Sequence, residues 1–165
     1  MNFSPLGLTF FAIRRCYSSL VPGGEGTQRE LRMAELNLKL AVRVLIAEDF
    51  PLFRQFICSM LAGRSDLRII EEVSDGVEAV QKAAELKPDL ILLDIGLPTM
   101  NGIEVARRIR TLVPESKIIF LSQESSADLI EEALNTGARG YVVKAQAASQ
   151  LLATIDAAIS NAVPR

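Results

Sequence analysis

Residues 89–110, with the sequence DLILLDIGLPTMNGIEVARRIR, carry the clearest structural pattern in this chain. The apolar run at 90–93 is typical of a strand buried on both faces of a parallel sheet. Asp94 follows this run directly and is itself followed by an isoleucine, so a position on a solvated surface explains it poorly. Apolar residues then recur at helical spacing within 102–112. The stretch predicts a buried strand, a carboxylate at its carboxyl end, and a helix.

Further strands and helices alternate on both sides of this stretch. Runs of apolar and β-branched residues predict the other strands at 42–47, 67–73, 117–121 and 140–143. Apolar residues at helical spacing predict helices at 51–62, 77–86, 102–112, 127–135 and 146–160. Repeated βα units of about 20–25 residues with short crossovers build a parallel sheet with helices on both faces. We therefore predict an α/β fold with a doubly wound, five-stranded parallel sheet.

The composition limits the class of protein. Of the 165 residues, 49% are hydrophobic and 23% are charged, which suits one globular domain that buries a core without disulfides. The net charge of −2 and the 5% aromatic content argue against a nucleic-acid surface. Because the sequence has no histidine, chemistry that needs an imidazole of this chain is excluded.

Hydropathy and cysteine usage predict a cytoplasmic protein without membrane contact. No apolar run approaches the roughly 20 residues that a membrane span needs. Cys16 and Cys58 form no CxxC motif and have no neighbours of metal-ligand type. Cys58 lies in a helical apolar pattern, so we expect a buried free thiol there.

Residues 1–41 differ from the rest of the chain. The segment 3–13 is mostly apolar, but arginines follow it rather than precede it, which disfavours a secretory signal. Proline and glycines at 22–26 then predict a flexible break. Two interpretations stay open: a disordered or loosely attached extension, or a translation start at Met33. We therefore divide the chain into an extension at 1–41 and a folded domain at 42–162.

Polar groups follow the predicted strands at one edge of the sheet, where sheets of this kind bind ligands. Glu48 and Asp49 follow the first strand, Asp94 the third, Ser122 the fourth and Lys144 the fifth. Taken alone, Asp49 could be a helix N-cap, Ser122 an ordinary serine after a strand, and Lys144 a solvated flanking residue. Taken together, the residues favour a binding site.

The combination of groups predicts a particular chemistry. Three carboxylates at one edge repel one another and raise each other's pKa unless a cation lies among them. Oxygen ligands of this kind, with room for water and a phosphate, suit Mg²⁺. A lysine and a hydroxyl supply donors for anionic oxygens. The set therefore predicts phosphoryl transfer to Asp94, with the metal offsetting the repulsion between the phosphoryl group and the carboxylate.

Four segments of the chain share one resemblance: VLIAEDF (44–50), DLILLDIGLPTMNGIEVARRIR (89–110), IIFLSQ (118–123) and GARGYVVKA (137–145). Through them, residues 42–161 resemble the response-regulator receiver domains of bacterial two-component signalling. The second and fourth of these segments are most similar in sequence to receivers of the NarL/LuxR class. The resemblance implies a flavodoxin-like (βα)5 fold.

The resemblance also implies a role for each acidic residue. Asp94 is expected to be the phospho-accepting residue and a metal ligand. Asp49 is expected to bind the Mg²⁺ directly and Glu48 through water. Gly96 is expected to contribute its backbone carbonyl.

Three further residues match groups that respond to phosphate. Ser122 matches the switch hydroxyl, Lys144 the phosphate-pairing lysine, and Tyr141 an aromatic residue whose ring changes rotamer. Tyr141 also fits the simpler role of a half-buried strand aromatic. The family commonly has a proline after the lysine, but this chain has Ala145. A cis bond before a residue other than proline costs about 2.5–4 kcal/mol, and the sequence leaves the isomer of this bond open.

The resemblance further implies a signalling domain rather than an enzyme, apart from slow self-dephosphorylation. A sensor histidine kinase would supply the phosphoryl group, and a second copy or a downstream protein would bind through residues 127–160. NarL/LuxR regulators usually carry a DNA-binding helix-turn-helix domain, but the last predicted helix runs nearly to Arg165. We therefore expect no output domain and no direct contact with nucleic acid from this chain.

The predicted helices within 127–160 carry more apolar residues than one buried stripe needs: Leu129, Ile130, Leu151, Leu152, Ile155 and Ile159. An interaction face and a deeper core would both explain this excess.

Two other classes of protein fit the residues less well. A phosphatase of the haloacid-dehalogenase type needs a second acid two residues after its nucleophile, and that position is Gly96. A flavodoxin-like cofactor binder needs a phosphate-binding loop after the first strand, where this chain has acidic residues. A receiver that no longer accepts phosphate is a further alternative, although all five expected side-chain positions are filled.

Overall fold

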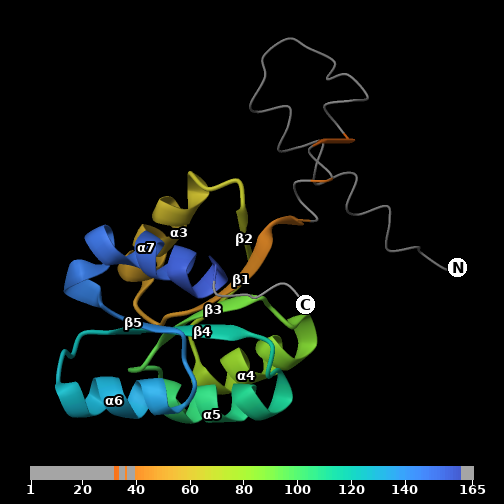
Figure 1. Cartoon of the computed structure of the whole chain (residues 1–165). Helices are drawn as coiled ribbons and strands as arrows, with labels where there is room; N and C mark the ends of the chain where they lie inside the picture. The colour runs from red at the N-terminus through yellow and green to blue at the C-terminus, as the bar shows by residue number, and fades with distance from the viewer. Residues whose placement is uncertain (1–31, 34–35, 37–39, 161–165) are drawn as a thin grey trace, which may run out of the picture. The chain divides into compact units, whose positions relative to one another are not determined.

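The computed structural model describes residues 32–33, 36 and 40–160. Within 40–160, five parallel strands form one sheet in the order β2-β1-β3-β4-β5 (Figure 1). They are β1 (Val42–Ala47), β2 (Leu67–Val73), β3 (Leu90–Asp94), β4 (Lys117–Ser122) and β5 (Gly140–Val143). The predicted doubly wound parallel sheet is therefore confirmed. Almost all of the predicted extension at 1–41, including Cys16, lies outside the described residues.

Helices connect the strands and cover both faces of the sheet. They are α3 (Pro51–Ala62), α4 (Gly76–Leu86), α5 (Gly102–Leu112), α6 (Ala127–Asn135) and α7 (Ala147–Ser160). In Figure 1, α3 and α7 lie on one face of the sheet, and α4, α5 and α6 lie on the other. The last predicted helix begins differently, because Lys144–Gln146 form a separate 3-10 turn, η1, before α7. This tighter turn takes the chain from the end of β5 back onto the sheet.

The sheet separates two hydrophobic cores, because successive side chains of a strand point to opposite faces. Leu93 and Phe120 are fully buried in the core beneath α4, α5 and α6. Leu92 and Leu121 are fully buried in the core beneath α3 and α7. Burial on both faces explains why β3 is apolar at every position before Asp94.

The strand order explains where the functional edge lies. From β1 the chain passes to β2 on one side, whereas from β3 it passes to β4 on the other side. Open α/β sheets bind ligands at this reversal, beyond the carboxyl ends of the strands. Ala47 pairs with Leu93 in the register of β1 and β3. The residues that follow them, Glu48 and Asp94, are therefore brought together.

The loop after β3 lies tightly against this edge. A Cβ atom on Gly102 would collide with the backbone of Asp94 and Ile95, so glycine lets α5 begin close to the acidic residues. Thr99 in the same loop has φ +60°, which is unusual for a β-branched residue. Its hydroxyl donates to Asp75 Oδ2 at 2.6 Å. Asp75 also caps α4, accepting two backbone N–H groups of its first turn.

Two interpretations of residues in and just before α3 are wrong. Asp49 is not the N-cap of α3, because Phe50 occupies that position with an extended backbone and makes no side-chain cap bond. Cys58 is a free thiol, as expected, but it is partly exposed rather than buried. Partial burial and the nearby Glu72 raise the pKa of this thiol, which makes it less reactive.

Among the described residues, no helix has both the length and the apolar character needed to span a membrane.

Candidate functional site

The three predicted carboxylates meet at the carboxyl ends of β1 and β3. Glu48, Asp49 and Asp94 each place one oxygen within 4.8 Å of the other two. Glu48 is fully buried and Asp94 is 4% exposed, whereas Asp49 is exposed to solvent. The site therefore combines two buried acids with one that faces the solvent.

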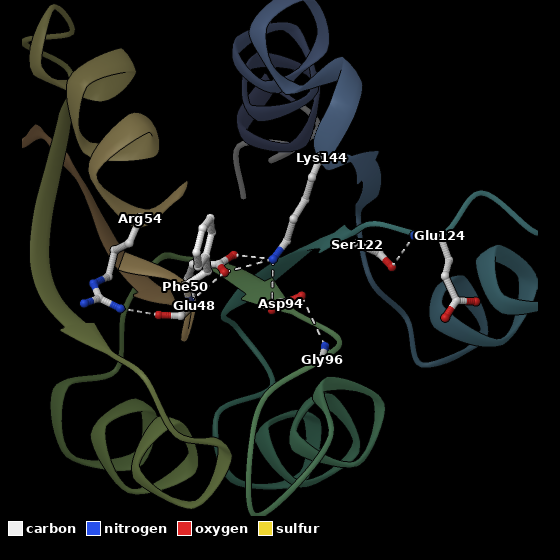
Figure 2. A network of polar contacts seen from close by, with 8 residues as sticks. All are labelled: Glu48, Phe50, Arg54, Asp94, Gly96, Ser122, Glu124 and Lys144. Atoms are coloured by element: carbon white, nitrogen blue, oxygen red, sulfur yellow. Dashed lines mark hydrogen bonds and ion pairs between the residues drawn. The ribbon is translucent and has the colours of Figure 1, made fainter. Parts of the chain in front are cut away.

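Lys144 contacts both buried acids (Figure 2). Its Nζ lies 2.9 Å from Glu48 Oε1, 2.8 Å from Glu48 Oε2 and 3.0 Å from Asp94 Oδ2. The Phe53 ring adds a cation–π contact, with its centroid 5.0 Å from the same nitrogen. Because only 11% of this lysine side chain is exposed, its interpretation as a solvated flanking residue is wrong. The described residues contain no cis peptide bond, so the bond between Lys144 and Ala145 is trans.

Burial and the contact with Lys144 shift the pKa of the Glu48 carboxyl group in opposite directions. Burial raises the pKa of its carboxyl group and the charge of Asp94 adds to this, while the hydrogen bond from Lys144 opposes it. Its Oε1 also accepts the backbone N–H of Phe50 at 3.1 Å. Its Oε2 is buried and, among the described residues, has no well-directed hydrogen-bond partner, although Lys144 Nζ is close. Positive charge in this site therefore favours the ionised form of Glu48.

The donors present fit a Mg²⁺ ion. All three side chains offer carboxylate oxygens, which are the ligands that Mg²⁺ prefers in proteins. A buried carboxylate oxygen without a directed hydrogen bond is costly, and a cation or its bound water would satisfy Glu48 Oε2. The exposure of Asp49 also suits a metal that keeps several of its water ligands.

The Asp94 carboxylate has a defined orientation. Its Oδ1 accepts the backbone N–H of Gly96 at 3.1 Å, and its Oδ2 faces Lys144 (Figure 2). A Cβ atom at position 96 would lie 3.6 Å from Asp94 Oδ2, an ordinary contact distance, so this residue lies directly beside the carboxylate. Gly96 therefore lies next to the acidic group, as its predicted role requires, and that role stays a prediction.

Ser122 and Tyr141 contact the same neighbouring residue. Ser122 is 5% exposed, and its Oγ accepts the backbone N–H of Glu124 at 3.1 Å. Tyr141 donates its hydroxyl to the Glu124 carbonyl at 2.9 Å. Tyr141 is half-buried and packs against the core beneath α4, α5 and α6, as the simpler interpretation expected. Its role as a switch stays a prediction.

Two residues at the site were missed by sequence reasoning. Phe53 belongs to the apolar pattern that predicts the helix at 51–62, and its ring also lies against Lys144. Arg54 donates to the Glu48 carbonyl at 2.5 Å. A lone arginine within the apolar run PLFRQFICSML was the available signal for Arg54, because a charged residue in such a run needs a partner.

Comparison with known proteins identifies the family. Residues 44–156 match the response regulator receiver domain family, and the chain belongs to this family. Transcriptional regulatory protein LnrK of Bacillus subtilis is 34% identical over 114 residues, which are 69% of this chain and 52% of LnrK.

Two solved structures of response regulators resemble this chain. The signal receiver domain of the putative response regulator NarL from Mycobacterium tuberculosis is 28% identical with a TM-score of 0.68, covering 73% of this chain and 98% of that one. A DNA-binding response regulator of the LuxR family from Staphylococcus aureus is 28% identical with a TM-score of 0.65. The match covers 70% of this chain and 96% of that one. The chain is thus a receiver most similar to the NarL/LuxR class, and it spans about half the length of the curated relatives it matches.

Proposed function

We propose that this domain accepts a phosphoryl group on Asp94 from a sensor histidine kinase in a Mg²⁺-dependent reaction. The Asp94 carboxylate is the main support for this proposal. It is 4% exposed, lies 3.0 Å from the Lys144 ammonium, and belongs to a cluster of three acids. Membership of a family of signalling domains supports the same function.

The transfer is a displacement at phosphorus by an Asp94 oxygen. The P–N bond of the kinase phosphohistidine breaks, and the imidazole leaves with the electron pair. Because this sequence has no histidine, the phosphohistidine lies outside these 165 residues. Lys144 is close enough to Asp94 to pair with the oxygens of the new phosphoryl group.

The expected metal-binding groups are Asp49 and Asp94 directly, Gly96 through its carbonyl, and Glu48 through water. Bound Mg²⁺ would offset the repulsion between the Asp94 carboxylate and the incoming phosphoryl group. Glu48 is better placed to act at a distance than Asp49, because its carboxylate is fully buried and already pairs with Lys144.

Acetyl phosphate tests this function without the kinase. The chain is expected to gain the mass of one phosphoryl group in the presence of Mg²⁺, as acetate leaves with the electron pair of the broken P–O bond. Intact-protein mass spectrometry measures the gain, and EDTA should abolish it because the acidic cluster would lose its cation. An unmodified mass with Mg²⁺ present, or equal modification in EDTA, would contradict the proposal.

We propose that phosphorylation changes a protein-interaction face within residues 127–160. Of the six apolar residues predicted there, Leu151 and Ile155 belong to the core, which the deeper-core interpretation expected. Ile159 is half-buried and packs against the same core. Three others are half-buried and would supply the apolar part of the face: Leu129, Ile130 and Leu152. Exposed acids on α6 favour a protein partner or a second copy over nucleic acid.

A chain that begins at Met33 is expected to match the full chain in melting temperature and in labelling by acetyl phosphate. The five described strands and every proposed site residue lie within 42–147, so we expect the domain to keep its fold and its site without the residues before Met33. Calorimetry and mass spectrometry compare the two chains. A fall of several degrees in melting temperature would mean that the domain boundary is wrong.

A further inference from the structure

Arg54 joins three elements around the acidic site. It lies in the first turn of α3, and its guanidinium Nη1 donates to the backbone carbonyl of Glu48 at 2.5 Å. Its Nε lies 3.5 Å from Glu72 Oε2 on the neighbouring strand β2. Figure 2 shows the guanidinium reaching the Glu48 backbone from the side opposite Lys144.

The bond from Arg54 fixes one particular peptide. The Glu48 carbonyl belongs to the planar peptide unit that leads to Asp49, so the direction of this carbonyl sets the orientation of that plane. The backbone N–H of Glu48 is held separately by the carbonyl of Val73 at the end of β2, at 3.0 Å. Both polar groups of the Glu48 backbone are therefore held, and the chain enters Asp49 in a defined direction.

Asp49 depends on this backbone more than the other two acids do. Glu48 and Asp94 are buried, and each also has an ion pair with Lys144. Asp49 is exposed to solvent. The orientation of its backbone therefore determines how readily its carboxylate reaches the carboxylates of Glu48 and Asp94. An error in that orientation would separate an expected direct metal ligand from Asp94.

We propose that Arg54 is a positioning residue for the metal site, which acts by orienting the peptide between Glu48 and Asp49. This inference rests on the proposed function. The planar guanidinium suits the role because it directs one nitrogen to the Glu48 carbonyl and another toward Glu72. A lysine keeps the charge, but it has a single nitrogen and makes one directed contact in place of two.

The alternative is that Arg54 only stabilises the fold. Arg43 is a matched control, because its guanidinium also binds backbone carbonyls, those of Lys87 at 3.0 Å and Leu86 at 2.7 Å. These groups lie at the opposite end of β1 from the acidic cluster. Arg54→Gln and Arg43→Gln therefore remove the same kind of bond at the two ends of one strand.

The experiment measures Mg²⁺ binding to the unphosphorylated full chain by calorimetry, together with the melting temperature. We expect Arg54→Gln to weaken Mg²⁺ binding about tenfold, the usual lower range for losing a partner that orients a metal ligand. Arg54→Lys should fall between Arg54→Gln and the unaltered chain. Arg43→Gln should lower the melting temperature and leave the Mg²⁺ dissociation constant unchanged.

Phosphorylation by acetyl phosphate supplies a second readout. In Arg54→Gln the Mg²⁺ concentration for half-maximal labelling should rise about tenfold, while the rate at saturating Mg²⁺ stays within about threefold. A higher Mg²⁺ requirement with a nearly unchanged rate indicates a poorly positioned metal ligand. Loss of the nucleophile would instead lower the rate even at saturating Mg²⁺.

Several outcomes would overturn the inference. The first is that Arg54→Gln and the unaltered chain have the same Mg²⁺ dissociation constant. The second is that Arg43→Gln weakens Mg²⁺ binding as much as Arg54→Gln does. If Arg54→Gln does not fold, Arg54→Lys takes its place in the test. A Mg²⁺ dissociation constant in Arg54→Lys equal to that of the unaltered chain would then overturn the inference. Failure of the proposed function is distinguishable, because then the unaltered chain itself would neither bind Mg²⁺ nor gain a phosphoryl group.

Discussion

Asp94→Asn is expected to abolish labelling by acetyl phosphate and Mg²⁺, with no phosphorylated species detectable by intact-protein mass spectrometry. The amide of asparagine has nearly the shape of the carboxylate, but it lacks the negative oxygen that must attack phosphorus. Its carbonyl oxygen can still accept the Gly96 N–H that Asp94 Oδ1 accepts now. The change therefore removes the nucleophile while leaving the loop after β3 in place.

Asp75→Asn is the matched control for this variant. Asp75 is another acid at the carboxyl end of a strand, where it caps α4 and accepts the hydroxyl of Thr99. Its replacement should change stability little, because asparagine is also a good N-cap, and labelling should persist. Labelling of Asp94→Asn at the level of the unaltered chain would show that another residue accepts the phosphoryl group.

The sequence was most informative where local pattern and burial agree. All five strands were predicted to within one residue, because each is a short segment rich in apolar or β-branched residues between turn residues. The grouping of Glu48 with Asp94 was also predictable, since parallel strands bring their carboxyl ends to one edge. These features depend on secondary structure and topology, which leave a direct pattern in the chain.

Contacts made by long side chains were not predictable in the same way. Lys144 was expected to pair with phosphate, but its ion pair with Glu48 spans 96 residues and depends on the path of a flexible side chain. The bonds of Arg54 to Glu48 and Glu72 have the same character. The positive φ of Thr99 also left no pattern, because a loop imposes it against the preference of the residue.

Ser122 and Tyr141 are expected to transmit phosphorylation through Glu124, which both contact. Ser122 Oγ accepts the Glu124 N–H, and the Tyr141 hydroxyl donates to the Glu124 carbonyl. A phosphoryl group on Asp94 offers the Ser122 hydroxyl a charged acceptor, and charge-assisted hydrogen bonds are stronger than neutral ones. If Ser122 turns toward it, Glu124 loses one of its two contacts.

The Tyr141 ring would then be freer to rotate inward beside β4. This movement would alter the face formed by α6, β5 and α7. Phosphorylation need only shift an existing equilibrium between two arrangements, and a difference of about 1–3 kcal/mol would suffice.

Beryllofluoride, which mimics a phosphoryl group on the aspartate, is expected to change amide hydrogen exchange within residues 127–160. It should also increase light scattering if a second copy is the partner. Ser122→Ala should still bind beryllofluoride at Asp94 but show a smaller change in exchange, because alanine cannot turn a hydroxyl toward the acceptor. Ser126→Ala is the control: this exposed serine is the N-cap residue before α6 but makes no side-chain cap bond, so its replacement should preserve the full response.

Tyr141→Phe separates the ring from its hydroxyl. Phenylalanine keeps the aromatic packing but cannot donate to the Glu124 carbonyl, so the outward arrangement loses its hydrogen bond. Because one such bond contributes about 0.5–1.5 kcal/mol, part of the exchange change should be present in Tyr141→Phe before beryllofluoride is added. The variant should then respond less to the mimic than the unaltered chain does. Identical exchange in 127–160 with and without beryllofluoride in the unaltered chain would show that Ser122 and Tyr141 do not couple Asp94 to this face.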